Sequence, residues 1–280
     1  SPMGKGLFKR GIIQSGAYNL FNWTSKDDAE ELGLKTQTVL NAPDLQTMKT
    51  LSAESILSAS IGLNHPYGPN IDGALIPNNL TKLFDEGSFN NVDLMIGSNK
   101  NEDYMYIDES VTEKDINRLV ENYYPDDRDK ILSLLDLEDP RLAMDHLTTN
   151  QVTLCPSVFI ARSMAKKGNN VYQYHFTRMR EGSEKILSYH GAEIPYVFNT
   201  HDQWLPTNKD DQELTEVMVG YWVEFAKKGT PNSKKYPTWL KFSKDEYYQI
   251  LDIPIESASD IEKDFCAIII NEMRQRSSLK

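Results

Sequence analysis

The chain has 280 residues, of which 39% are hydrophobic and 25% charged, as in an ordinary globular protein rather than a disordered one. Its formal net charge of −11 argues against binding to nucleic acid or to anionic membranes, so we expect neutral small-molecule substrates. No apolar run approaches the roughly 18 residues that a transmembrane helix needs.

Strand-like and helical segments alternate along the chain, which predicts an α/β fold with a mainly parallel central sheet flanked by helices. Short β-branched or aromatic runs predict strands over 10–17, 92–99, 170–177 and 246–253. Apolar residues at three- and four-residue spacing predict helices over 155–167, 211–228 and 257–275. The second of these helices carries one apolar stripe, formed by Leu214, Val217, Met218, Tyr221, Trp222 and Phe225. No internal repeat or composition break marks a domain boundary.

The stretch "SYHGAEIPYVF" (188–198) contains His190, the histidine whose neighbours best fit a catalytic base. Gly191 gives the backbone freedom beside His190, and the apolar run that follows would anchor an exposed loop to the core. A histidine base also needs a carboxylate that fixes its tautomer and stabilises the imidazolium. The loop after the predicted strand 92–99 offers two candidates for this acid, Glu102 and Asp103.

A nucleophile and a metal site are both missing from the sequence pattern. The elbow pattern G-x-S-x-G does not occur, and Ser15 in "GIIQSG" lacks the preceding glycine at the right spacing. No H-E-x-x-H and no paired cysteine spacing predicts a metal site. Cys155 and Cys266 could be two buried thiols or one disulfide, and the residues alone leave both open. Two sequons make Asn22 and Asn79 candidate glycosylation sites.

Several motifs together resemble the type-B carboxylesterases, the cholinesterase-like branch of the α/β-hydrolase superfamily. They are "SPMGKGLFKRGIIQSGA", "IDGALIPNNLTKLF", "GSNKNED", "TLCPSVFIARSMAKKGNNVYQYHF" and "YHGAEIPYVF", in the family's order and almost from end to end. The resemblance implies that residues 1–280 form the C-terminal portion of a single α/β-hydrolase domain. It also implies that a G-E-S-A-G elbow and the oxyanion-hole glycines lie on an N-terminal segment upstream of residue 1.

The same resemblance assigns roles to individual residues. His190 matches the catalytic histidine and Glu102 the triad acid, in the chain order serine, acid, histidine. Ser15 and Glu193 match positions that support the histidine loop through hydrogen bonds. Cys155 and Cys266 match a pair that forms a disulfide in the family, which implies an oxidising compartment. Two positions depart from the family: Asp103 replaces a frequent glycine, and Asn150 replaces a frequent aspartate that forms an ion pair.

The resemblance implies a serine carboxylic-ester hydrolase that needs no cofactor and no metal, and whose nucleophile is carried by an N-terminal segment or chain of the same protein. We expect a secreted protein, or one in the periplasm or the secretory-pathway lumen. The alternative is a non-catalytic cholinesterase-like adhesion or interaction module, because the superfamily includes such domains. The residue at the upstream elbow distinguishes the two, since only a serine there permits the reaction.

Overall fold

The computed structural model describes residues 1–17, 20, 24–63 and 67–278. It divides the chain into two compact units. The small unit comprises Ser1–Met3 and Asn22–Leu80, and the large unit comprises Gly4–Phe21 and Thr81–Lys280.

In its described residues, the small unit contains three α-helices and one pair of very short strands. The parallel strands are β2 (Thr24–Ser25) and β3 (Asn70–Ile71), and the helices are α1 (Lys26–Val39), α2 (Leu45–Met48) and α3 (Ala53–Gly62). The side chains of Ser25, Asp44 and Ser52 each accept a hydrogen bond from a backbone N–H three residues on, so each helix begins at an N-cap. Large apolar side chains on these helices, among them Leu34 and Ile61, lie exposed.

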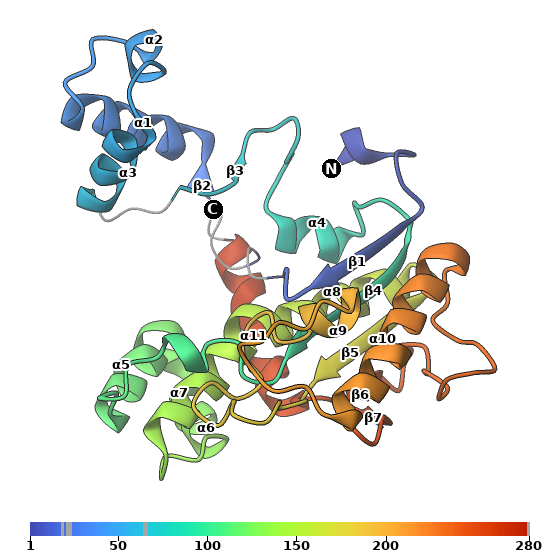
Figure 1. The fold of residues 1–280 in the computed structure, drawn as a ribbon. Coiled ribbons are helices and arrows are strands. Elements are labelled where there is room, and N and C mark those ends of the chain that lie inside the picture. Colours follow the sequence, from blue (N-terminus) through green and yellow to red (C-terminus); the bar gives the residue numbers. More distant parts are fainter. Residues whose placement is uncertain (18–19, 21–23, 64–66, 279–280) are drawn as a thin grey trace. The chain divides into compact units, whose positions relative to one another are not determined.

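The large unit is built on a five-stranded sheet in the order β1-β4-β5-β6-β7 (Figure 1). Its first four strands are parallel, and only β7 runs antiparallel to its neighbour β6. The bounds are β1 (Arg10–Gln14), β4 (Asp93–Asn99), β5 (Val171–Phe176), β6 (Tyr247–Leu251) and β7 (Glu256–Ser259). All four predicted strands are therefore present, and the predicted α/β class with a mainly parallel sheet is confirmed.

Helices flank this sheet (Figure 1). The chain opens with the 3-10 turn η1 (Pro2–Gly4). The remaining helical elements are α4 (Leu80–Glu86), η3 (Tyr104–Tyr106), α5 (Glu113–Tyr123), η4 (Pro125–Asp127), α6 (Arg128–Ser133), α7 (Pro140–Thr149), the π-helix η5 (Asn150–Leu154), α8 (Cys155–Lys166), α9 (Ile194–Phe198), α10 (Lys209–Lys228) and α11 (Lys263–Ser278). Within the described residues, no helix is both long and apolar enough to span a bilayer.

The main core lies between the sheet and helices α9 and α10. Tyr172, Tyr174 and Phe176 alternate along β5 and point to this face, where the α10 stripe meets them. The predicted stripe is confirmed, because its members are buried apart from Val217, which is only partly buried. On the other elements, α8 packs against β4 and β5, and α11 packs against α8. A disulfide between Cys155 and Cys266 joins these two helices across 111 residues of sequence.

One predicted boundary is wrong. The helix expected over 257–275 begins only at Lys263, because residues Glu256–Ser259 form β7 instead. These four residues hydrogen-bond to β6 in register from Glu256, opposite Ile250, to Ser259, opposite Tyr247. The pairing satisfies the backbone groups along the outer edge of β6. These hydrogen bonds stabilise the strand by more than the weak helix preference of so short a segment could oppose.

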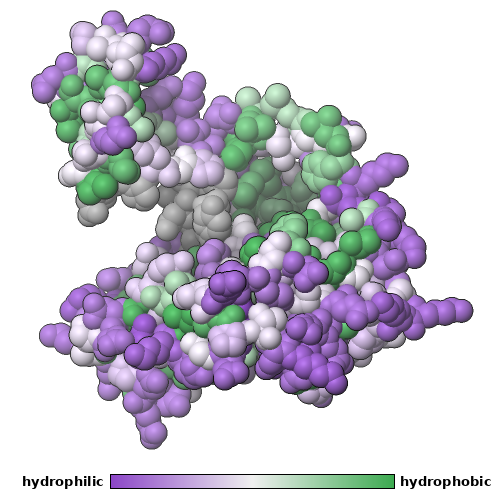
Figure 2. Space-filling model, in the orientation of Figure 1, coloured by the Kyte–Doolittle hydropathy of each residue, from purple (hydrophilic) through white to green (hydrophobic). Residues whose placement is uncertain are grey.

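Strand β1 lies at the other edge of the sheet. It pairs with β4, and all five of its residues are only half-buried even though two of them are isoleucines. Figure 2 shows apolar side chains near this edge and others on the helices of the small unit. Such an edge offers unpaired backbone groups and apolar surface to a further segment of chain.

Gly97 in the middle of β4 provides a test of the packing. A Cβ at this position would lie 2.3 Å from the carbonyl oxygen of Tyr174, its partner on β5, and 2.5 Å from the tyrosine ring. We expect Gly97→Ala to lower the free energy of unfolding by about 1–3 kcal/mol or more, measured by urea unfolding. The matched control is Gly11→Ala on β1, where the nearest atom would lie at 3.9 Å. Equal stability of the two variants would contradict this packing.

Candidate active site

The structure brings Glu102 and His190 together from positions 88 residues apart. Glu102 lies three residues after the end of β4, and His190 lies in the segment between β5 and α9. Because β4 and β5 are parallel neighbours, the loops that follow them meet at the same edge of the sheet. His190 Nδ1 and Glu102 Oε2 are 2.6 Å apart. The carboxylate is 2% exposed, whereas the imidazole side chain is 51% exposed, so a buried acid holds an accessible base.

The second oxygen of Glu102 is also fully engaged. Oε1 accepts hydrogen bonds from Ser15 Oγ at 2.5 Å and from the backbone N–H of Asn99 at 2.6 Å. Ser15 follows β1 directly and has a left-handed φ of 50°, which is uncommon for a residue other than glycine. Ser15 thus supports the acid rather than the histidine, and the ends of β1 and β4 both contribute to holding the carboxylate.

A second buried carboxylate, Glu193, lies in the same network. Its Oε2 accepts from Asn99 Nδ2 at 2.6 Å, and its Oε1 accepts from Gln14 Nε2 at 3.0 Å. The amide of Asn99 also donates to the backbone oxygen of Tyr189 at 2.8 Å, immediately before His190. Burial raises the pKa of Glu193, although the hydrogen bonds from Asn99 and Gln14 oppose the rise. Glu193 therefore ties the histidine segment to the ends of β1 and β4.

The charge around His190 favours its protonated form. The hydrogen bond to Glu102 is the largest cause that raises the pKa of His190; burial opposes it, and the negative charges of Glu102, Glu193 and Asp103 add to the rise. An ionised carboxylate can only accept, so Nδ1 carries the proton and Nε2 of the neutral ring is an acceptor. The described residues offer Nε2 no hydrogen-bond partner. An exposed Nε2 acceptor backed by a buried carboxylate is suited to general-base chemistry.

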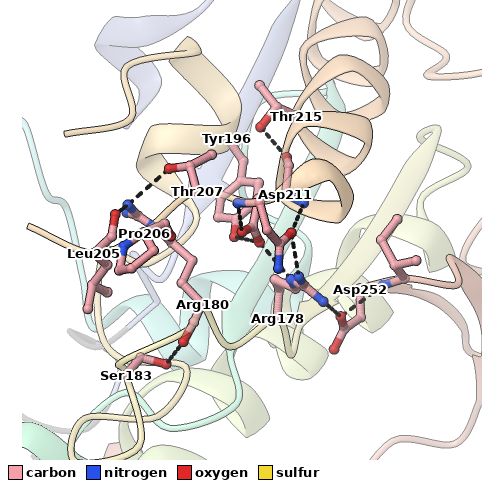
Figure 3. A network of polar contacts seen from close by, with 12 residues as sticks. Arg178, Arg180, Ser183, Tyr196, Leu205, Pro206, Thr207, Asp211, Thr215 and Asp252 are labelled. Atoms are coloured by element: carbon pink, nitrogen blue, oxygen red, sulfur yellow. Dashed lines mark hydrogen bonds and ion pairs between the residues drawn. The ribbon is translucent and has the colours of Figure 1, made fainter. Parts of the chain in front are cut away.

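Beyond the carboxylates, an ion pair anchors the chain on both sides of the histidine (Figure 3). Arg178 Nε donates to Asp211 Oδ1 at 2.8 Å, and Tyr196 OH in α9 donates to the same oxygen at 2.8 Å. Burial raises the pKa of Asp211, but the hydrogen bonds from Asn208, Arg178 and Tyr196 outweigh it and leave that pKa lowered. Because Arg178 precedes His190 and Tyr196 follows it, one fully buried carboxylate on α10 fixes both ends of the segment.

Arg180 holds the same segment at a further point (Figure 3). Its guanidinium donates to the backbone oxygens of Leu205 and Pro206, the latter at 3.2 Å, and its own carbonyl accepts from Ser183 Oγ at 2.7 Å. Within the segment so fixed, Gly191 has a φ of 90°, which other residues rarely adopt, directly after His190.

The other predicted positions lie apart from this network or at its margin. Asp103 is half-buried and joins the site through its backbone N–H, which donates to Asp145 Oδ1 at 3.0 Å. Asn150 is buried and donates from Nδ2 to the backbone oxygen of His146 at 2.9 Å. Asn79 is only 7% exposed. Asn22 lies outside the described residues.

Sequence reasoning missed polar residues that hold Glu102 and the histidine segment, among them Gln14, Asn99, Asp145 and Thr149. Thr149 Oγ1 accepts from the backbone N–H of Glu102 at 3.1 Å. Gln14 and Asn99 end β1 and β4, and polar residues at the carboxyl ends of neighbouring parallel strands are a signal that could have identified them. Thr149 lies in a helix and has no such signal.

The charge pattern predicts how His190 titrates. In the NMR spectrum of histidine-labelled protein, its imidazole should have a pKa above the ordinary value of 6.5. Glu102→Gln removes the negative charge that favours the imidazolium, so the pKa of His190 should fall. Asp103→Asn should lower the pKa of His190 less, because the charge of Asp103 raises it less than those of Glu102 and Glu193 do. An unchanged pKa in the Glu102→Gln variant would show that this carboxylate does not govern the histidine.

Comparison with known proteins places these residues in a family. Residues 1–269 match the model of the carboxylesterase family. Neuroligin-3 of Mus musculus is 29% identical over 285 residues, which cover 86% of this chain and 34% of neuroligin-3. Liver carboxylesterase 1 of Mus musculus is 25% identical over 330 residues, which cover 99% of this chain and 58% of that protein.

Solved structures show the same fold. A PNB esterase structure superposes with a TM-score of 0.80 at 22% identity and covers 96% of this chain and 59% of its own. A carboxylesterase of Geobacillus stearothermophilus superposes with a TM-score of 0.78 at 21% identity, covering 95% of this chain and 59% of its own. The chain thus spans less than two thirds of each of these proteins. Since the family model matches nearly all of its length, the chain belongs to the carboxylesterase family.

Proposed function

We propose that this chain supplies the acid and the base of a serine carboxylic-ester hydrolase, with Glu102 as the acid and His190 as the base. The observation that carries the proposal is the 2.6 Å contact between a buried glutamate and an exposed histidine whose Nε2 has no hydrogen-bond partner among the described residues. Membership of the carboxylesterase family supports the reaction class. Ser15 and Glu193 act as positioning residues in this proposal, because they hold the acid and the histidine segment.

In the proposed reaction, His190 Nε2 accepts the hydroxyl proton of a serine as that serine attacks the ester carbonyl carbon. The imidazolium then gives its proton to the leaving alcohol, and an acyl-enzyme forms. Water attacks the acyl carbon while Nε2 again accepts a proton, the imidazolium returns this proton to the serine oxygen as the acyl–oxygen bond breaks, and the carboxylic acid leaves. Glu102 stabilises the imidazolium in both halves and does not itself take the proton. The reaction needs no cofactor.

The nucleophilic serine and the oxyanion hole belong, in this proposal, to a segment of the same protein outside residues 1–280. The pattern G-x-S-x-G is absent from these residues, and the chain spans only 58% of liver carboxylesterase 1. The half-buried edge strand β1 supports the idea, since its backbone and isoleucines offer a place for further strands of the same sheet. Small neutral esters are the proposed substrates, given the net charge of −11.

The second candidate is a non-catalytic cholinesterase-like interaction module. The observation in favour of this candidate is the match to neuroligin-3. The complete support of the Glu102–His190 pair by Ser15, Asn99 and Glu193 favours the enzyme, because a binding module has no need of a buried acid behind an exposed imidazole. For either function, the disulfide between Cys155 and Cys266 supports an oxidising compartment such as the secretory pathway, the periplasm or the extracellular space.

Fluorophosphonate labelling of the intact native protein tests the proposal. We expect a label on a serine outside residues 1–280, together with esterase activity. His190→Ala should lower kcat by about 10³-fold or more, and Glu102→Gln by about 10³–10⁴-fold, because each removes part of the proton-transfer machinery. The matched control is His146→Ala, which removes a histidine paired with Glu262 instead. No label on protein that contains the upstream segment would favour the interaction module.

A further inference from the structure

We propose that Asp145 and Thr149 on α7 are positioning residues for the triad acid, holding the loop 101–103 so that the Glu102 carboxylate stays in line with His190. This inference deepens the proposed function and rests on it. The observation behind it is that three consecutive loop residues are tied to two buried side chains of one neighbouring helix: Asn101 and Asp103 to Asp145, and Glu102 to Thr149.

Asp145 contacts the loop on both sides of Glu102. Its Oδ2 accepts from Asn101 Nδ2 at 2.8 Å, and its Oδ1 accepts from the backbone N–H of Asp103 at 3.0 Å. Asp145 is fully buried, and an unpaired carboxylate there would be strongly unfavourable. The two donors from the loop therefore satisfy Asp145, and in return Asp145 fixes the residues that flank the acid.

Thr149 connects Asp145 to Glu102 itself. The backbone N–H of Glu102 donates to Thr149 Oγ1 at 3.1 Å, and the Thr149 hydroxyl donates to Asp145 Oδ1 at 3.1 Å. A hydroxyl can turn either way, but a carboxylate can only accept. Asp145 thus directs the hydroxyl proton toward itself and leaves the Oγ1 lone pair facing the Glu102 N–H. The two residues lie four apart on α7, so they share one face of the helix.

The packing around these groups makes the hydrogen bonds important. A cavity of about 240 Å³ is lined by Asn101, Asp145 and Thr149, along with His175 and other residues. Because side chains leave space here, steric confinement alone does not fix the loop. Burial raises the pKa of Asp145, while the hydrogen bonds from Asn101, Asp103 and Thr149 oppose the rise and favour the ionised form that accepts all three.

A matched pair of variants at position 149 tests the inference in the intact native protein. Thr149→Val keeps the shape and removes the hydroxyl, so the Glu102 N–H is left buried without its acceptor. We expect kcat to fall about tenfold while KM stays within about twofold. Thr149→Ser keeps the hydroxyl and should restore kcat to within about twofold of the wild type. Asp145→Asn replaces one accepting oxygen with an NH2 group, which faces a donor from the loop in either orientation, and it should lower kcat at least as much as Thr149→Val.

The titration of His190 provides a readout that a general loss of stability would not move. Displacement of Glu102 weakens the hydrogen bond that raises the pKa of His190, so Thr149→Val and Asp145→Asn should lower this pKa toward 6.5. Thr153→Val is the control, because it removes a buried hydroxyl whose one hydrogen bond within the described residues goes to the backbone oxygen of Thr149. It should leave both kcat and the His190 pKa near their wild-type values.

The outcomes separate the two proposals. If Thr149→Val matches Thr149→Ser in kcat and in the His190 pKa, the positioning role is wrong. If the native protein has no esterase activity, the proposed function fails, and the titration still decides whether Asp145 and Thr149 hold the acid against the histidine. Should Asp145→Asn fail to fold, the two variants at position 149 decide the question alone.

Discussion

The site depends on one constraint: the Glu102 carboxylate is 2% exposed and carries a negative charge that must be satisfied by donors. Those donors come from separate parts of the chain, namely Ser15 after β1, the backbone of Asn99 at the end of β4, and His190 after β5. No single segment could supply them. The carboxylate is therefore stable only when the ends of three adjacent parallel strands lie together. The strand order of the sheet thus fixes the geometry of the site.

The histidine has to satisfy two opposed requirements. It must be exposed to meet a substrate, and it must be held firmly enough for Nδ1 to stay on Glu102. The structure separates these requirements in space. The imidazole is about half exposed, while the backbone around it is fixed by two sets of buried polar groups: Asn99 with Glu193, and the Arg178–Asp211–Tyr196 cluster (Figure 3). Buried charge thus supplies rigidity where an exposed loop alone would supply none.

Membership of the carboxylesterase family and the half-buried edge strand β1 are both consistent with a sheet that continues beyond β1. The sheet of the large unit carries the acid and the base at one end and a half-buried strand at one side. Opposite that side, β7 closes the sheet by pairing antiparallel with β6. In the proposed enzyme, the segment that brings the nucleophile would also complete the β1 edge, so assembly of the sheet and assembly of the triad would be the same event.

The sequence by itself determined strands β1, β4, β5 and β6, helices α8 and α10 with most of α11, and the class of fold, because these follow from local patterns: the α10 stripe and the apolar run of β4 are readable residue by residue. The family motifs also singled out Glu102, His190, Ser15 and Glu193, but the local pattern could not choose between Glu102 and Asp103. Only the tertiary structure decided that Glu102 Oε2 lies 2.6 Å from His190, whereas Asp103 is joined to α7 through its backbone. It also decided that residues 256–259 pair as a strand, and that Asp145 and Thr149 lie behind the acid. These features arise from contacts between residues far apart in the chain, and such contacts leave no periodicity in the sequence.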